Sequence, residues 1–554
     1  MLCSPRRARR PEQVERTAWA GAQGWERAPA RPSRKAVNPR RRISHGDDHP
    51  VSNQRRTHIN ATYDTVIIGA GSAGCVLASR LTEDESRSVL LIEGGPDFAS
   101  VESLPDEVRL GYSTPSGMVA RSYDWGYEAR TGVSREPIIR GKLVGGSSAV
   151  NAQIYLWGLP YDFDRWVALG NDTWSWNAVE PYFRKVETDQ DYADGHGQDG
   201  PIPVCRYRKA DWLPVQAAFH QSCLDRGFAD CPDLNKPYAT GIGPYPMNNP
   251  DGIRVSTAIG YLNPVRSRPN LTIFSNTEVE RILLDANRAT GLTLSRDGEM
   301  TEVRADNIIV AAGAIGSPLL LQRSGVGDPD HLNKVGVDLS IALPGVGQNL
   351  RDHPAVPMYW EAETTGPLNV HWHQVGLRYT AQGSSDTDDM IVYVAHVRDE
   401  PRLLMRPTVN LARSNGHLAI TSPDPAAKPE IDYRMFDDPY DRERMREAIR
   451  LCRRLVEHPA FEPHVTRPMQ PDHRDIEDDQ RLDAWILAHA TTGHHVSGTC
   501  KMGPASDPHA VVDQNGAVHG VEGLRVIDAS IFPDCVRANI HATVLMMAER
   551  LSDQ

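Results

Sequence analysis

The sequence lacks the features of a membrane protein and those of a disulfide-rich or zinc-stabilised one. It contains no run of about 18 apolar residues, the length that a spanning helix requires, so no transmembrane segment is expected. Its eight cysteines form no CxxC pair and no cluster with histidines at zinc-binding spacing. We therefore expect no metal site, and reduced thiols in a soluble, cytoplasmic protein.

The chain also lacks a net positive charge. Of its 554 residues, 60 are Lys or Arg and 72 are Asp or Glu, which gives a net charge of −12. Much of the basic charge lies at the start, because residues 1–60 contain 14 basic and 5 acidic residues. The acidic remainder would repel a phosphate backbone, so no nucleic-acid partner is expected. No apolar segment follows the arginine pairs of residues 1–60, and we expect this part to be a disordered basic extension.

A glycine-rich turn follows this extension. Residues 63–68 form a β-branched run that predicts a buried parallel strand, and residues 75–81 predict a helix. Between them lie Gly69, Gly71 and Gly74 in the spacing GxGxxG. The first glycine allows a tight turn, the second lets the backbone approach a pyrophosphate, and the third lets the helix pack closely on the strand.

An acidic residue completes this pattern. A second predicted strand, residues 88–92, leads into Glu93, which lies 19 residues after Gly74. At this spacing a carboxylate accepts hydrogen bonds from the adenosine ribose. The sequence therefore predicts a dinucleotide-binding unit, and this segment alone leaves both FAD and NAD open.

Two later segments resemble the signatures of one family. Residues 141–151 read GKLVGGSSAVN, and residues 313–327 read GAIGSPLLLQRSGVG after a predicted buried strand. Both resemble signatures of the glucose-methanol-choline (GMC) family of flavin oxidoreductases, and the resemblance runs from about Thr62 to the C-terminus. It implies bound FAD and an α/β (α+β overall) fold. A Rossmann-like FAD-binding domain is expected beside a substrate-binding domain built on a mixed or antiparallel sheet with helices.

The resemblance also implies that the two domains are assembled from discontinuous segments. The expected segments are 62–160 (FAD-binding, first part), 161–240 (mixed), 241–343 (FAD-binding, second part, including 303–327), 344–485 (substrate-binding) and 486–554 (catalytic and FAD-binding).

Cofactor contacts are implied at the glycine turn, at the first signature and near the C-terminus. The residues so assigned are Gly69, Gly71, Ser72, Ala73, Gly74, Glu93, Gly145, Gly146, Ser147, Asn151, Val279, Asp528, Ala529 and Asn539. For Asn151, Asp528 and Asn539 a purely structural role in turns and caps is the alternative. Family members with covalent flavin carry a histidine just before the signature asparagine. Val150 stands there in this chain and cannot form such a bond, so non-covalent FAD is expected.

Two histidines near the C-terminus are the candidate catalytic residues. Removing a hydroxyl proton calls for a base with a pKa near neutrality, for which histidine is the default. By resemblance, the base stands four residues before Thr499, which gives His495, and the partner that holds the substrate oxygen is assigned to His541. The two roles could be exchanged. His494 is the competitor, but on an extended backbone it would point to the opposite face from its neighbour.

The predicted function is FAD-dependent oxidation of a small-molecule alcohol to an aldehyde or ketone by hydride transfer to flavin N5. Oxygen, a quinone or a redox protein could accept the electrons, and resemblance to choline-dehydrogenase-like members favours a dehydrogenase. A lyase or photodecarboxylase on the same scaffold is one alternative. A flavin electron-transfer protein without substrate turnover is another.

Overall fold

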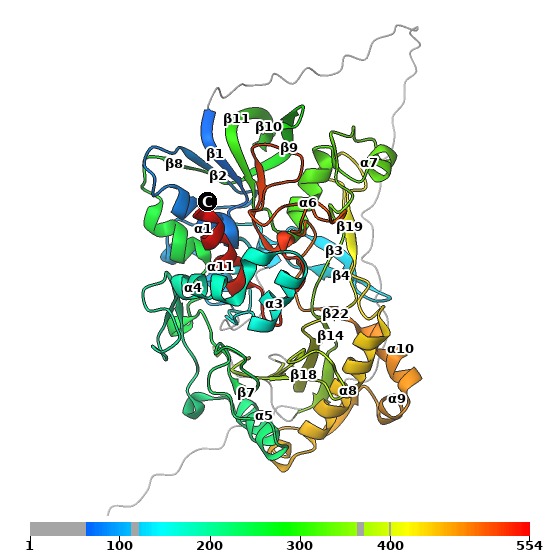
Figure 1. Cartoon of the computed structure of the whole chain (residues 1–554). Coiled ribbons are helices and arrows are strands. Elements are labelled where there is room, and N and C mark those ends of the chain that lie inside the picture. Colours follow the sequence, from blue (N-terminus) through cyan, green and yellow to red (C-terminus); the bar gives the residue numbers. More distant parts are fainter. Residues whose placement is uncertain (1–61, 112–120, 363–369, 398–399) are drawn as a thin grey trace, which may run out of the picture. The chain divides into compact units, whose positions relative to one another are not determined.

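The run of β-branched residues before Gly69 forms β1, an interior strand of a mixed sheet (Figure 1). The computed structural model describes residues 62–111, 121–362, 370–397 and 400–554. Within these residues the first sheet has seven strands in the order β8-β2-β1-β11-β10-β9, with β23 also paired to β11. The strands are β1 (Thr62–Ile68), β2 (Val89–Ile92), β8 (Leu271–Phe274), β9 (Thr277–Asp285), β10 (Arg288–Arg296), β11 (Glu299–Val310) and β23 (Leu524–Val526).

The central strands of this sheet pair in parallel and are buried. β1 pairs in parallel with β2 and β11, and β23 in parallel with β11, whereas β9 and β10 form an antiparallel extension. Every residue of β2 is buried, as expected for a parallel strand covered on both faces. Helix α1 (Ser72–Leu81) packs on β1 and β2, and α11 (His541–Ser552) packs on α1. The predicted strand, turn and helix are therefore present.

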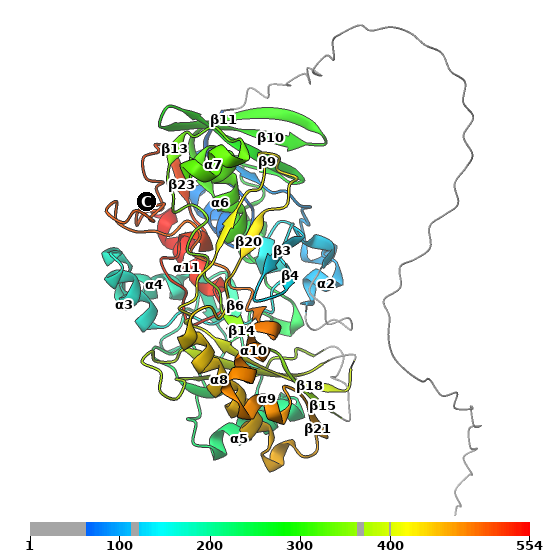
Figure 2. The same ribbon diagram turned by 90° about the vertical axis from the view of Figure 1, so that its right-hand side faces the viewer.

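A second sheet is antiparallel. In the described part of the chain it has eight strands, with the order β21-β15-β18-β17-β16-β7, and β14 links β18 to β22. They are β7 (Gly241–Pro244), β14 (Pro354–Ala355), β15 (Met358–Glu361), β16 (Val375–Tyr379), β17 (Met390–His396), β18 (Arg402–Val409), β21 (Arg467–Gln470) and β22 (Thr491–Thr492). Helices α5 (Pro214–Asp225) and α8 (Pro439–Val456) pack on it. Figure 2 shows the neighbours β9, β10 and β11 of the first sheet and β15 and β18 of the second.

The remaining regular elements connect and cover these sheets. They are α2 (Asp106–Arg109), β3 (Tyr127–Arg130), β4 (Arg135–Ile138), α3 (Pro160–Ala168), α4 (Trp176–Val186), β5 (Glu187–Asp189), β6 (Ile202–Val204), α6 (Gly313–Arg323), β12 (Val326–Gly327), α7 (Pro329–Val335), β13 (Ile341–Ala342), β19 (His417–Ala419), β20 (Glu430–Asp432), α9 (His473–Glu477) and α10 (Asp479–His489).

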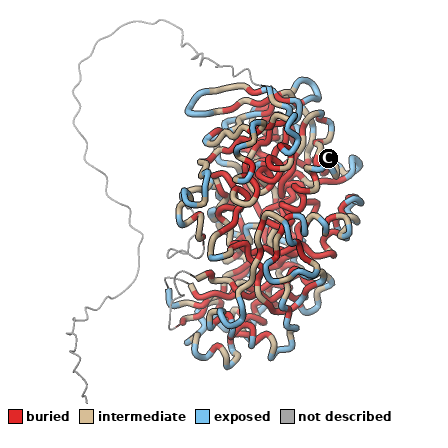
Figure 3. The backbone as a smooth tube through the Cα atoms, turned by 90° about the vertical axis from the view of Figure 1, so that its left-hand side faces the viewer, coloured by how far each residue is buried: buried red, intermediate tan, exposed pale blue. Residues whose placement is uncertain are grey.

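This arrangement confirms the predicted α/β (α+β overall) fold class. Buried residues run through both sheets and their helices, while exposed residues gather in the loops (Figure 3). The described residues form one compact unit, so the domain boundaries inside it stay predictions. β7 opens the segment 241–343 that we assign to FAD binding, yet it pairs with β16 of the second sheet. The predicted extension, residues 1–60, lies outside the described residues. No helix among the described residues is long and apolar enough to cross a membrane.

A buried ionic cluster follows α4. Glu187, Asp189 and His196 approach as closely as metal ligands would. However, His196 Nδ1 lies 2.8 Å from Glu187 and 3.2 Å from Asp189, and its Nε2 lies 2.9 Å from Asp233. Arg206 adds a second cation, 2.9 Å from Asp189. Burial alone would lower the pKa of His196, but its hydrogen bonds to Asp233 and Glu187 outweigh burial and raise the pKa to about 9. The cluster is therefore an ion-pair network around an imidazolium.

We predict that His196→Gln destabilises the fold in a pH-dependent way. The loss should be about 3 to 5 kcal/mol where His196 is charged, because buried carboxylates lose a cation. The folded pKa lies above the unfolded value of about 6.5, so this stabilisation is complete below about pH 6.5 and is lost as the pH rises through about 9. Urea unfolding at several pH values measures the difference, with exposed His473→Gln as the control. A loss that does not change with pH would contradict a protonated His196.

Candidate active site

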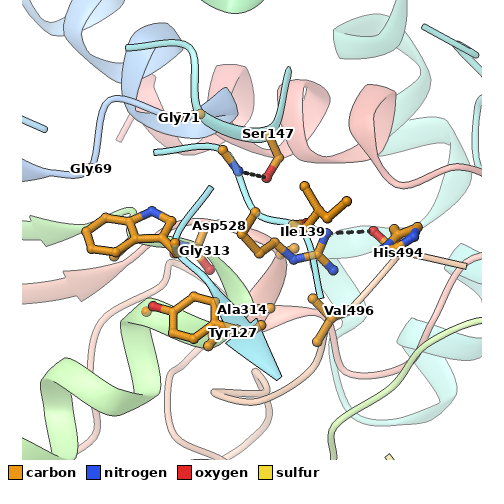
Figure 4. Close-up of a pocket in the computed structure, with 18 of the residues that line it drawn as sticks. Gly69, Gly71, Tyr127, Ile139, Ser147, Gly313, Ala314, His494, Val496 and Asp528 are labelled. Carbon is orange, nitrogen blue, oxygen red and sulfur yellow. Dashed lines mark hydrogen bonds between the residues drawn. The ribbon is translucent and has the colours of Figure 1, made fainter. Parts of the chain in front are cut away.

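A cavity of about 600 Å³ lies at the carboxyl ends of the parallel strands and reaches the second sheet. Figure 4 shows part of its wall, including Gly71, Ser147, Gly313 and Asp528. The predicted site residues that line the cavity are Gly69, Gly71, Ser72, Ala73, Glu93, Gly146, Ser147, Asn151, Val279, His495, Asp528, Ala529, Asn539 and His541. Gly74 and Gly145 are not part of the wall.

The glycines form a cradle of bare backbone. A Cβ at Gly74 would lie 1.8 Å from the Gly69 carbonyl oxygen, so this glycine allows the helix to pack on the turn. Gly71 differs, because a Cβ there would meet no protein atom closer than 3.9 Å, the Cα of Gly146. Gly146 has a φ of +52°, and a Cβ on it would lie 2.6 Å from the Cα of Gly71. The two glycines are therefore neighbours in the cavity wall. The space beside Gly71 is therefore open for a ligand.

Three helices begin at this wall. The first residues of α1, α6 and α11 are Ser72, Gly313 and His541, and none of the three helices has an acidic residue in its first turn. The first N–H of α6 already donates to the Asp528 carboxylate, whereas the N-termini of α1 and α11 favour an anion through their N–H groups and dipoles. His541 Nδ1 lies 3.4 Å from Ser72 Oγ, and its buried Nε2 has no hydrogen-bond partner among the described residues. This part of the cavity suits a pyrophosphate.

Two buried carboxylates hold the turns in place. Glu93 accepts hydrogen bonds from the backbone N–H groups of Ala70 (3.1 Å) and Gly95 (3.0 Å), and burial raises its pKa to about 7. Asp528 accepts hydrogen bonds from the backbone N–H of Gly313 (2.8 Å) and from the Ser317 hydroxyl. Both carboxylates line the cavity, and both rigidify the glycine turns that a dinucleotide would touch.

At the other end of the cavity, hydrogen bonds join His495 to two side chains. Its Nδ1 lies 2.9 Å from His353 Nδ1, and its Nε2 lies 3.0 Å from Asn539 Nδ2. His353 Nε2 lies 2.8 Å from the carbonyl oxygen of Val536. A carbonyl only accepts hydrogen bonds, so His353 Nε2 carries the proton. A neutral His353 then accepts at Nδ1 from His495 Nδ1–H, and His495 Nε2 is left with its lone pair.

The pKa values of the two hydrogen-bonded histidines at this end are lowered, which favours their neutral forms. Burial lowers the pKa of His353 to about 4. The pKa of His495 falls well below 6.5, first through burial and then through its neighbours His353 and His494. This direction differs from the near-neutral pKa that we expected of the base, and the assignment of His495 stays a prediction. An imidazole with a lowered pKa keeps its lone pair over a wider range of pH.

Comparison with known proteins identifies the family. Family models described as GMC oxidoreductase match residues 63–355 and 412–548. The chain belongs to the GMC oxidoreductase family. An oxygen-dependent choline dehydrogenase of Ectopseudomonas mendocina is 37% identical over 539 residues, which cover 89% of this chain and 94% of that protein.

Solved structures agree with this assignment. The structure of pyridoxine 4-oxidase from Mesorbium loti is 31% identical, has a TM-score of 0.83, and the match covers 89% of this chain and 99% of that one. An FAD-dependent oxidoreductase from Chaetomium thermophilum is 25% identical, with a TM-score of 0.80 and coverage of 89% and 98%. The resemblance to GMC oxidoreductases is thus confirmed over most of the chain.

In this GMC oxidoreductase both predicted histidines line the cavity, where they contact different side chains. Among the described residues no hydrogen bond joins His541 to His495; His541 lies against Ser72, and Asn539 contacts His495. His494 is not extended but has a φ of +63°, so the argument from alternating faces does not apply to it. It lines the cavity and its carbonyl accepts a hydrogen bond from Arg140, drawn in Figure 4.

Two further residues at this end, His353 and its neighbour Asp352, were not among the predicted site residues. Asp352 accepts a hydrogen bond from the backbone N–H of His495 (2.9 Å). The two residues stand just before β14, and β14 pairs with β22, which ends just before His494. This pairing brings together segments that are 142 residues apart in the chain. Only a long-range strand pairing identifies them, so the local sequence carries no signal for it.

Proposed function

We propose that this chain oxidises an alcohol to an aldehyde or ketone with FAD as the hydride acceptor. One observation carries the proposal. A single cavity combines a bare glycine cradle between helix N-termini with a neutral imidazole whose tautomer is fixed by hydrogen bonds. The family assignment and the FAD-dependent neighbour support the same reaction class.

The residues of the cavity fit FAD. Gly71 and Gly146 offer bare backbone to a pyrophosphate, and the N-termini of α1 and α11 supply positive potential there. The unpartnered Nε2 of His541 is available to the same group. Glu93 would accept hydrogen bonds from the ribose. Val150 lines the cavity and has no group that could bond covalently to the flavin, which supports non-covalent binding.

When bound, FAD supplies the acceptor for the hydride that leaves the substrate carbon. His495 takes the hydroxyl proton at Nε2, where the tautomer leaves a lone pair. The imidazolium that results still donates from Nδ1 to His353, so the same hydrogen bond holds the ring before and after proton transfer. The substrate thus loses its hydroxyl proton to Nε2 of His495, and its C–O bond would become a carbonyl once the bound flavin accepts the hydride.

Asn539 takes the partner role that the sequence analysis gave to His541. Its amide N–H points at His495 Nε2. A substrate hydroxyl that donates to the same Nε2 displaces this N–H, which is then available to the substrate oxygen as negative charge develops on it. Tyr393 holds the other end of the amide, because its hydroxyl donates to Asn539 Oδ1 (3.4 Å).

We predict that Gly71→Val abolishes FAD retention without unfolding the protein. The backbone at Gly71 is extended (φ −82°, ψ −158°), so a side chain causes no strain, but valine would fill the approach to the pyrophosphate. Flavin content after purification should fall by about tenfold or more, and Gly71→Ala should give an intermediate value. The melting temperature of the apoproteins checks the fold. Wild-type flavin content in Gly71→Val would refute the assignment of Gly71 to the pyrophosphate site.

We predict that His495→Ala lowers the rate of anaerobic flavin reduction by an alcohol by roughly 10² to 10⁴-fold, the usual contribution of a positioned base. FAD binding should survive. His494→Ala is the matched control, because it removes the adjacent cavity-lining histidine and should cost little. Stopped-flow absorbance over a panel of alcohols measures both. A larger loss in His494→Ala would reverse the assignment, and a panel in which no alcohol reduces the wild type would refute the proposed function.

We predict that His353→Leu slows flavin reduction by roughly 10- to 100-fold, because a buried Nδ1–H of His495 loses its acceptor and the other tautomer becomes competitive. Glutamine at position 353 can both accept from His495 and donate to Val536, so His353→Gln should recover most of the rate. The substrate KM and the flavin content should change little in either variant. Equal losses in the two variants, with lowered melting temperatures, would indicate a purely structural role.

A further inference from the structure

We infer that the alcohol accepted by this cavity carries a negatively charged group, and that Arg406 binds it. This inference rests on the proposed function, because it names the substrate class of the same site. It is argued from the side chains of the second sheet that line the cavity near His495.

Arg406 lies close to the proposed base. In the register of β17 and β18, Arg406 stands opposite Tyr393, so the two side chains share a face of the sheet. Tyr393 donates to Asn539, and Asn539 contacts His495. Thr408 lies two residues beyond Arg406 on the same face, and all of these side chains line the cavity. A substrate held at His495 therefore extends toward Arg406.

The charge of Arg406 is not neutralised by the described residues. Its terminal nitrogen donates to the carbonyl of Thr492. Within the described residues its buried Nε has no hydrogen-bond partner, and no carboxylate forms an ion pair with it. Arg140 repeats this pattern. It also lines the cavity, donates to the carbonyls of Ile139 and His494, and leaves Nε and one terminal nitrogen buried without partners in the described chain.

No acidic side chain in the described part of the chain forms an ion pair with Arg406, whereas Arg140 lies close enough to Asp352 for their charges to interact. The acidic residues that line the cavity belong to other elements, namely Glu93, Glu128, Glu278, Glu280, Asp424 and Asp528. Asp352 is not part of the cavity wall. Its oxygens accept hydrogen bonds from Thr492 Oγ1 and from the backbone N–H groups of His353 and His495. A carboxylate, sulfonate or phosphate would gain charge-assisted hydrogen bonds from Arg406, whereas a quaternary ammonium would be repelled by it.

Three isosteric alcohols test this inference. Isethionate, 3,3-dimethylbutan-1-ol and choline share a hydroxyethyl group and differ in a tetrahedral head that is anionic, neutral or cationic. Each is titrated anaerobically into the holoenzyme, and its dissociation constant is taken from the change in flavin absorbance. Isethionate should bind at least roughly tenfold more tightly than the neutral alcohol, and choline most weakly.

Variants at two arginines of β18 identify the group responsible. Arg406→Gln should abolish the preference for isethionate, and Arg406→Lys should keep part of it. Arg402→Gln is the matched control, because Arg402 is 42% exposed and pairs with Glu400 outside the cavity. It should leave all three dissociation constants unchanged.

Several results would overturn the inference. They are choline binding as tightly as isethionate, no binding of isethionate, or a preference that survives in Arg406→Gln. A shift in the flavin midpoint potential in Arg406→Gln, with anion binding unchanged, would assign Arg406 to the flavin ring instead. Failure of the proposed function is distinct, because it would appear as anion binding without flavin reduction by any alcohol.

Discussion

The hydrogen bond that His353 donates to the carbonyl oxygen of Val536 determines the chemistry of the whole reactive end. Because a carbonyl cannot donate, this single contact fixes the proton on one nitrogen of His353, and the next contact then fixes it on His495. The lone pair of His495 faces Asn539 as a consequence, without any charged partner. A base oriented by neutral hydrogen bonds stays neutral when buried, and burial lowers the pKa of both histidines.

The two ends of the cavity differ in the source of their positive charge. At the dinucleotide end, partial charges at helix N-termini face bare glycine backbone, which favours an anionic ligand without burying a cationic side chain. At the reactive end the neutral forms of His353 and His495 are favoured, and the formal charge belongs to Arg140 and Arg406. The neighbouring guanidinium groups also disfavour protonation of His495. In the proposed mechanism, substrate selection and base strength are therefore linked through the same electrostatic field.

The features that the sequence predicted are those encoded over short distances. Gly69, Gly71, Gly74 and Glu93 lie within one strand-helix-strand unit, so pattern and spacing suffice to predict the turn, the helix and the fold class. The partners of His495 are encoded differently. His353 reaches it only because β14 pairs with β22. The choice between Asn539 and His541 depends on how the chain enters α11, and the left-handed backbone of His494 changes where that side chain points.

Neutron diffraction from a deuterated crystal of the oxidised protein tests the central claim most directly, because it locates the exchangeable protons on the imidazole rings. The account predicts deuterium on His353 Nε2 and on His495 Nδ1, with none on His495 Nε2. Deuterium on His495 Nε2, or on both of its nitrogens near neutral pH, would contradict it, because the proposed base would then have no lone pair to accept the substrate proton.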